Sequence, residues 1–295
     1  MTPDTPAYLR SVVTELAEEI GARPHWDLFR LDGAAERIEK RFAACGYAVS
    51  SQEFVYADRT YRNIVAEVIG TEAPQQILVV GAHYDTVTNS PGADDNASGV
   101  AGLLALARVL AARPLKKTVR FVAFALEEMP TYRTRNMGSY HYAESLQLSQ
   151  AHVEGMVCLE MIGYFTDRPG SQHYPLPFMS LKFPKQGDFI AIVGNTRSAA
   201  FTRRMVEGFR AATDLPLSTL NAPAVVVGID FSDHWSFGKF GYPALMVTDT
   251  SFYRNPHYHT PEDLPDTLDY ERMAKVVEGL RGAIEGWGGR GDAGL

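Results

Sequence analysis

Two spacings of apolar residues alternate along the 295 positions of this chain. Short, nearly continuous apolar runs are typical of strands buried on both faces of a parallel sheet. These runs are residues 76–82, 118–126, 155–159, 189–193, 224–227 and 244–247, and residues 63–69 alternate as an exposed strand does. Segments with helical spacing lie among them, at residues 8–20, 33–46, 98–112, 138–145, 198–213 and 270–287.

This order of elements predicts an α/β protein with a doubly wound, mostly parallel sheet flanked by helices. No linker interrupts the order, so we expect a single domain over residues 1–295, with a helical N-terminal segment at about 1–60 packed on it. The glycine-rich end, at about residues 286–295, is expected to be flexible. In open α/β sheets ligands bind beyond the carboxyl ends of the strands, which is where functional residues are expected.

Composition narrows the classes of partner. The formal net charge of -7 and the lack of a Lys/Arg cluster argue against a nucleic-acid partner. Apolar runs stay shorter than the roughly 18 residues of a membrane helix. The first ten residues do not have the pattern of a signal peptide, and only two cysteines occur, so a cytoplasmic location is expected, with export open if the chain is trimmed. The oligomeric state is left open.

Residues with metal-binding side chains follow the apolar runs directly or after a short loop, and the pair Asp94–Asp95 lies in the loop just before the helical segment at Ser98. Taken singly, each has a common structural explanation, such as capping a helix. Together they would gather at one edge of the sheet, and histidine nitrogen and carboxylate oxygen are ligands of zinc. The residues in question are His83, Asp85, Asp94, Asp95, Glu127, Glu128, Glu160, His257 and His259.

Spacing and charge suggest how such a site would work. Asp85 lies two residues after His83 in an extended segment, so its carboxylate can accept a hydrogen bond from the imidazole and fix its tautomer. Adjacent Glu127 and Glu128 diverge, so one can bind metal while the other faces a substrate. Two zinc ions would neutralise one bound hydroxide and the three carboxylates of Asp95, Glu128 and Glu160.

Six stretches of the chain resemble the M28 family of zinc aminopeptidases, over roughly residues 60–285. They are GAHYDTV (81–87), PGADDNASGVAGLLALARVL (91–110), FALEEM (124–129), CLEMIGY (158–164), FSDHWSF (231–237) and YHTPEDLPDTLDY (258–270). The resemblance implies a hydrolase with two zinc ions per chain that cleaves the N-terminal amide bond of peptides. It also implies a cis peptide bond between Asp95 and Asn96.

Roles follow from the same resemblance. His83 would bind one zinc, oriented by Asp85, and Asp95 would bridge both ions. The remaining ligands would be Glu128, Glu160 and His259, with His257 as a competitor of His259. Many members of the family have aspartate in place of Glu160, and residues 129–137 are longer and more basic than expected.

The implied reaction is metal-assisted hydrolysis. Glu127 would take a proton from the attacking water and pass it to the leaving nitrogen. Tyr253 or Tyr258 would help to hold the oxyanion. Residues 165–184 would form either part of the substrate pocket or a surface flap, and Arg135 would bind a substrate carboxylate unless its loop is solvated.

Three alternatives are kept. A glutaminyl cyclase of the same fold would bind a single zinc ion and cyclise its substrate. A carboxypeptidase of the same family would hold a terminal carboxylate with Arg133, Arg135 or Arg254. A non-enzymatic binding module would have lost metal ligands, whereas this chain has every expected ligand type.

Overall fold

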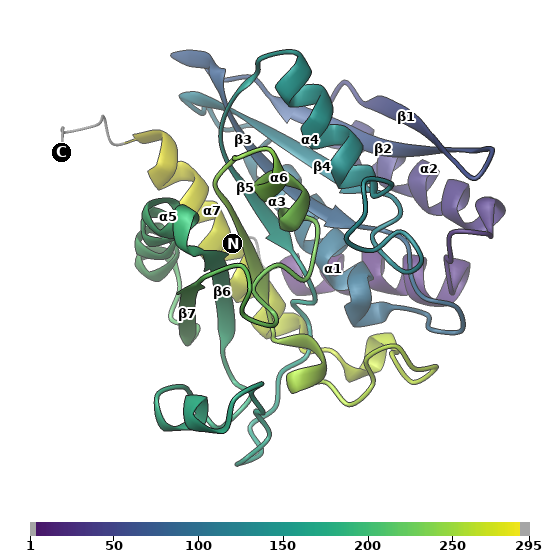
Figure 1. Cartoon of the computed structure of the whole chain (residues 1–295). Coiled ribbons are helices and arrows are strands. Elements are labelled where there is room, and N and C mark those ends of the chain that lie inside the picture. The colour runs from purple at the N-terminus through teal and green to yellow at the C-terminus, as the bar shows by residue number, and fades with distance from the viewer. Residues whose placement is uncertain (1–3, 290–295) are drawn as a thin grey trace.

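The apolar runs form the centre of one sheet, and the amphipathic segments form the helices that cover it (Figure 1). The computed structural model describes residues 4–289. The strands are β1 (Ser50–Tyr56), β2 (Arg59–Val68), β3 (Ala73–His83), β4 (Lys117–Phe124), β5 (His152–Leu159), β6 (Ile190–Asn195), β7 (Leu217–Ala222) and β8 (Ala244–Thr248). The helices are α1 (Thr5–Thr14), α2 (Leu28–Ala44), α3 (Gly99–Leu110), α4 (Gly138–Leu148), α5 (Ala199–Ala212), α6 (His234–Lys239) and α7 (Tyr270–Gly289).

The strand order is β1-β2-β4-β3-β5-β8-β6-β7. The four central strands are parallel, since β3 pairs in parallel with β4 and β5, and β8 pairs in parallel with β5. Antiparallel pairing adds β2 and β1 at one side and β6 at the other, with β7 parallel to β6. The α/β fold is confirmed, and the carboxyl ends of the four central strands meet at one edge.

Alternate strand residues face two cores. Leu78 and Val80 pack in the main core with α1, α2, α3, α5 and α7. Val79 and Phe124 pack on the opposite face with α4 and α6, which lie in front of the sheet in Figure 1. Burial on both faces explains why the central strands are continuous apolar runs rather than alternating ones.

Three expectations about elements are wrong. Residues 224–227 form a turn in which Val226 and Val227 line a cavity instead of pairing in the sheet, and the strand that precedes this turn is β7. The N-terminal segment is helical only as far as Ala44, because the mostly polar β1 follows as an edge strand. We expected a flexible tail from about residue 286, but α7 continues to Gly289. The rest of that expectation concerns residues 290–295, which lie outside the described residues.

The single-domain organisation stays a prediction. Within residues 4–289, no helix combines the length and the apolar character needed to cross a membrane.

Candidate metal centre and active site

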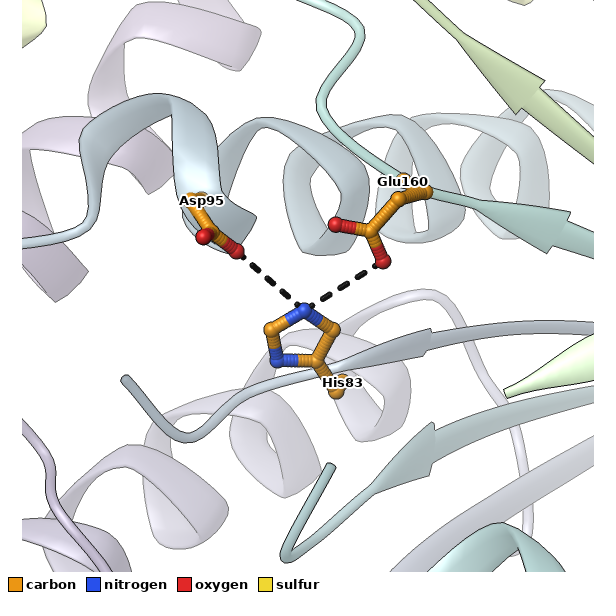
Figure 2. A group of neighbouring side chains, drawn as sticks. All are labelled: His83, Asp95 and Glu160. Atoms are coloured by element: carbon orange, nitrogen blue, oxygen red, sulfur yellow. Dashed lines mark ion pairs between the residues drawn. The ribbon is translucent and has the colours of Figure 1, made fainter. Parts of the chain in front are cut away.

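A cluster of histidine and carboxylate side chains lies at the carboxyl edge of the central strands. His83 ends β3, Glu160 directly follows β5, and Asp95 lies just before α3. Figure 2 shows the two carboxylates pointing at the same imidazole nitrogen. His83 Nε2 lies 3.3 Å from Asp95 Oδ1 and 3.4 Å from Glu160 Oε2.

A second group shares one member with the first. His259 Nε2 lies 3.0 Å from Asp95 Oδ2 and 3.2 Å from Glu128 Oε1. Within each group the ligand atoms all lie within 4.8 Å of one another. The two oxygens of Asp95 therefore face two different histidines, as a bridging carboxylate does.

The donor set fits zinc. Nitrogen and oxygen donors surround each position, and the side chains of His83 and Asp95 are almost completely buried. Three buried atoms, His83 Nε2, Asp95 Oδ1 and Glu128 Oε1, have no hydrogen-bond partner within the described residues. Buried polar atoms without partners are costly, and a bound cation would satisfy all three.

Protons compete with metal for these atoms. Burial alone would lower the pKa of His83, but Glu160, Asp85 and Asp95 outweigh it and raise that pKa well above its ordinary value. Burial likewise opposes protonation of His259, yet its bonds to Asp95 and Glu128 raise the pKa of this residue to about 10. A metal ion would displace a proton from each ring, so metal binding should release protons.

Asp85 contacts more of the site than its spacing predicted. Its Oδ1 lies 3.5 Å from His83 Nδ1, beyond an ordinary hydrogen bond, and its backbone oxygen is closer at 3.2 Å. Both oxygens favour a proton on Nδ1, which leaves Nε2 free for metal. The Asp85 carboxylate accepts hydrogen bonds from the backbone N–H groups of Glu127 and Glu128, at 3.1 Å and 3.0 Å. One carboxylate thus orients two segments of the site.

Asp263 fixes the loop that carries Asp95, and its role was missed in the sequence. Its carboxylate accepts hydrogen bonds from the backbone N–H groups of Asp94 and Asp95, at 2.9 Å and 3.1 Å. The Asp95–Asn96 peptide bond is cis, as the family resemblance implies. Membership of the stretch YHTPEDLPDTLDY was the only sequence signal for Asp263.

Ser232 was missed in the same way, although the stretch FSDHWSF contains it. Its hydroxyl donates to Glu160 Oε2 at 2.5 Å and lies 3.1 Å from the Cys158 sulfur. All three side chains are buried. Ser232 therefore holds one oxygen of Glu160 in place.

Glu127, Tyr253 and Tyr258 are among the residues that line a cavity beside the cluster. Burial raises the pKa of the Glu127 carboxyl well above its ordinary value, and nearby Glu160 and Glu128 add to the shift. Tyr258 stacks on His259, and burial followed by the charges of neighbouring carboxylates, among them Glu128, raises its pKa. Tyr253 also lines the cavity, but burial is the only cause acting on its pKa. Tyr258 is therefore the tyrosine of this pair that contacts an expected ligand, since its ring stacks on His259.

The cavity has a volume of about 460 Å³. Residues of the 165–184 loop line it, so this loop belongs to the pocket rather than to a remote flap. Arg133 and Arg135 are exposed and are not among the lining residues, which removes Arg135 from the expected substrate-binding set. Arg254 is buried behind the wall, where its guanidinium donates to Gln172 Oε1 and to the Phe189 carbonyl, both at 2.8 Å.

Two other histidines near these residues in the sequence, His257 and His234, lie away from the cluster. His257 packs edge-on against Tyr164, with the ring centroids 6.2 Å apart. The Nε2 atom of buried His234 lies 2.7 Å from the Ile229 carbonyl. The structure thus brings His259, and not His257, to the carboxylates.

Comparison with known proteins identifies the family of this chain. A sequence model of peptidase family M28 matches residues 63–284. An uncharacterized protein of Escherichia coli, YfbL, is 42% identical over 284 residues, which cover 94% of this chain and 86% of that protein. Aminopeptidase YwaD of Bacillus subtilis is 38% identical over 237 residues, which cover 78% of this chain but only 45% of YwaD.

Among solved structures, the zinc aminopeptidase BSAP from Bacillus subtilis has the same fold, with a TM-score of 0.74 at 18% identity over 96% of this chain and 95% of that one. The fold is that of a solved zinc aminopeptidase, and the family model and the named relatives identify the chain as a zinc-dependent peptidase. More narrowly, the chain belongs to peptidase family M28.

Proposed function

We propose that this chain is a two-zinc aminopeptidase that hydrolyses the N-terminal amide bond of peptides. The proposal of two zinc ions rests on one observation: the carboxylate of Asp95 lies between His83 and His259. A single-zinc enzyme would need only one of the two groups. The names of relatives such as aminopeptidase YwaD support the reaction class.

In this proposal each metal has three protein ligands. One position is formed by His83, Asp95 and Glu160, and the other by Asp95, Glu128 and His259. Zinc, when bound, supplies Lewis acidity and lowers the pKa of water toward neutrality. Asp85 and Ser232 act on the ligands, because they fix the orientation of the His83 ring and of the Glu160 carboxylate.

Glu127 is the proposed general base and acid. It lines the cavity beside the ligands, and its buried carboxylate has a raised pKa, which suits both acceptance and donation of a proton. Tyr258 is the proposed donor to the oxyanion, because it lies among the same carboxylates at the edge of the cavity.

Recognition of a free amine fits this cavity better than recognition of a carboxylate. Glu127, Glu128 and Glu160 line its metal end, whereas its described lining contains no lysine or arginine. With zinc bound, Glu128 and Glu160 would be neutralised as ligands, so the lining offers a substrate carboxylate no cationic side chain to pair with, whereas Glu127 can accept a hydrogen bond from a free amine. The lining therefore supports an aminopeptidase over a carboxypeptidase.

Two measurements test the proposal. Elemental analysis of the purified protein should give two zinc ions per chain, and one ion would favour the glutaminyl cyclase alternative. Carboxy-blocked dipeptides should be cleaved and amino-blocked ones should not. Glu127→Gln should abolish turnover while the zinc content stays the same, and retained turnover would remove Glu127 from the mechanism.

A further inference from the structure

The cavity opens to solvent beside the segment that follows Glu127 and Glu128. Residues of β6, β7 and β8 form its floor. Helix α6 packs against β5 and β8, and beyond it two irregular segments, within residues 172–183 and 226–231, cover the floor. Among the large apolar residues of the lining, Met129 and Val227 are exposed, at 66% and 57%. The opening therefore lies between the segment that begins at Met129 and one of the two covering segments.

The rest of a peptide substrate should leave through this opening. Glu127 is the proposed donor of a proton to the leaving nitrogen, so the residues after the scissile bond begin beside it. The backbone N–H of Tyr132 donates to the Glu128 carbonyl at 3.2 Å, so the chain makes one helical turn there, and the Tyr132 side chain lines the cavity. We call residues 128–133 the rim turn, because a departing peptide passes them.

Arg133 ends the rim turn and lies outside the cavity lining. Its guanidinium carbon is 5.6 Å from the ring centroid of Phe231, which lines the cavity and packs edge-on against Tyr132. The Arg133 side chain is exposed, and no carboxylate within residues 4–289 forms an ion pair with it. A guanidinium stacked on an aromatic ring keeps its N–H edge available, and that edge matches a carboxylate with two parallel hydrogen bonds.

The backbone at Arg133 is held in a conformation that arginine does not favour. Its φ of 52° lies in the left-handed region. The hydroxyl of buried Thr131 lies 2.8 Å and 2.7 Å from the carbonyl oxygens of Leu126 and Glu128, and the Arg133 N–H donates to the Met137 sulfur at 3.2 Å. Such backbone conformations cluster at ligand-binding and active sites. The fixed turn therefore presents the guanidinium from a defined place at the opening.

The length of the rim turn selects a length of peptide. Arg133 is five positions after Glu128, and a helical rise of ~1.5 Å per residue separates their Cα atoms by about 8 Å. An extended peptide spans ~3.5 Å per residue, so the terminal carboxylate of a tripeptide or tetrapeptide lies about 7–10 Å beyond the scissile bond. In a hexapeptide this distance is about 17 Å, which is beyond the rim turn.

We propose that this chain prefers peptides of three or four residues with a free C-terminus, whose terminal carboxylate pairs with Arg133 at the rim of the cavity. The inference rests on the proposed aminopeptidase function. It differs from the carboxypeptidase alternative, because the carboxylate is bound outside the cavity lining and belongs to a residue that stays in the product peptide.

Peptide pairs with a free or an amidated C-terminus test the inference. One pair is alanyl-glycyl-glycine and its amide, the other is alanyl-pentaglycine and its amide, and the release of alanine is measured. An exposed ion pair contributes up to about fivefold in affinity, so the free tripeptide should exceed its amide about fivefold in kcat/KM. The hexapeptide pair should differ less than about twofold, because its carboxylate lies beyond the rim turn. Equal kcat/KM values for the tripeptide and its amide would overturn the inference.

Ionic strength tests whether a charge pair causes the preference. Raising sodium chloride from about 0.05 M to about 1 M should bring the ratio of free to amidated tripeptide close to one, because exposed charges are screened. A ratio that stays at its low-salt value would contradict an ion pair with Arg133.

A matched pair of variants locates the carboxylate. Arg133→Met should lower the ratio of free to amidated tripeptide to about one, and Arg133→Lys should keep part of it, since an ammonium group has the charge but not the paired donors. Arg135→Met is the control and should keep the wild-type ratio, because Arg135 is also exposed but does not stack on a ring of the described lining. Each ratio is measured within one variant, so it does not depend on the amount of folded protein.

The outcomes separate this inference from the proposed function. A preference that persists in Arg133→Met, or that falls equally in Arg135→Met, would overturn the assignment to Arg133. Cleavage of free and amidated tripeptides at the same rate would overturn this inference alone. No release of alanine from any of the four peptides would overturn the aminopeptidase proposal and this inference with it.

Discussion

Arg23 links the N-terminal segment to the loops that carry the proposed zinc ligands, and replacing it by methionine tests that link. The Arg23 side chain is fully buried. Its guanidinium donates only to backbone carbonyls in the contacts observed: Tyr84 at 2.8 Å, Leu16 at 2.8 Å, Gly21 at 2.7 Å, Pro91 at 2.9 Å and Gly92 at 3.4 Å. Tyr84 follows His83, and Gly92 precedes Asp95 by three residues, so these bonds hold both ends of the ligand loop.

The expected loss of stability follows from these bonds. A hydrogen bond to a charged group contributes ~1.5–3 kcal/mol, and four of the five contacts of Arg23 are 2.9 Å or shorter. The contributions are not additive, and methionine removes the desolvation penalty of a buried charge. Because several buried carbonyls would lose their donor, we expect Arg23→Met to lower the free energy of unfolding by about 3–5 kcal/mol. That is a large part of a typical total of about 5–15 kcal/mol.

Urea unfolding of the zinc-free protein measures this loss, and competition with a chelator measures the zinc affinity. Arg23→Lys should lie between wild type and Arg23→Met, since one ammonium group cannot serve all five carbonyls. Arg210→Met, at an exposed position of α5, is the control and should stay within about 0.5 kcal/mol of wild type. Zinc affinity should fall about 10- to 100-fold in Arg23→Met. An unfolding free energy equal to that of the control, with unchanged zinc affinity, would refute the reasoning.

Three further predictions concern packing and metal. Gly279→Ala places a Cβ 2.4 Å from the Phe209 ring and should lower the free energy of unfolding by about 1–3 kcal/mol. In Gly33→Ala the new Cβ in α2 meets nothing within 4 Å, so this change should raise the free energy of unfolding by up to about 1 kcal/mol. Thermal melts in which both variants shift the midpoint in the same direction would contradict this prediction. Ser232→Ala removes the hydrogen bond to Glu160 and should weaken zinc binding about tenfold, with unchanged circular dichroism; full affinity would show that the bond is dispensable. Chelation of zinc should lower the thermal midpoint and re-addition should restore it, so an unchanged midpoint would argue against a metal bound in the fold.

Part of the metal cluster could be expected from the sequence because two of its members lie at strand ends. A buried parallel strand is visible as a continuous apolar run, and the residue that follows it must lie at the carboxyl edge. His83 and Glu160 follow this rule directly, since one ends β3 and the other follows β5. The other three members of the cluster, Asp95, Glu128 and His259, lie in loops, and the family resemblance assigned them to it.

Contacts that depend on the path of a loop could not be expected in this way. Asp263 binds backbone N–H groups about 170 positions earlier in the chain, and Arg23 binds carbonyls, which leave no mark on the sequence of the loop they belong to. Leu126, Met161 and His259 adopt left-handed backbone conformations beside or within the site, although each has a Cβ that disfavours them. Such positions are over-represented at functional sites, but only the folded structure reveals them.

The metal ligands depend on the sheet framework, whereas the wall of the cavity depends on loops that belong to this particular chain. The ligands come from the ends of central strands and from loops at the same edge of the sheet, so any chain with this framework and these residues can form the cluster. Beyond β8, the strands that form the floor of the cavity reverse direction, and loops replace the helix as its cover. Val226 and Val227 belong to that cover, so the apolar run at residues 224–227 lines the cavity instead of pairing in the sheet. Selectivity among substrates should therefore depend on the two covering segments and on the rim turn, while the reaction itself depends on the ligands at the edge of the sheet.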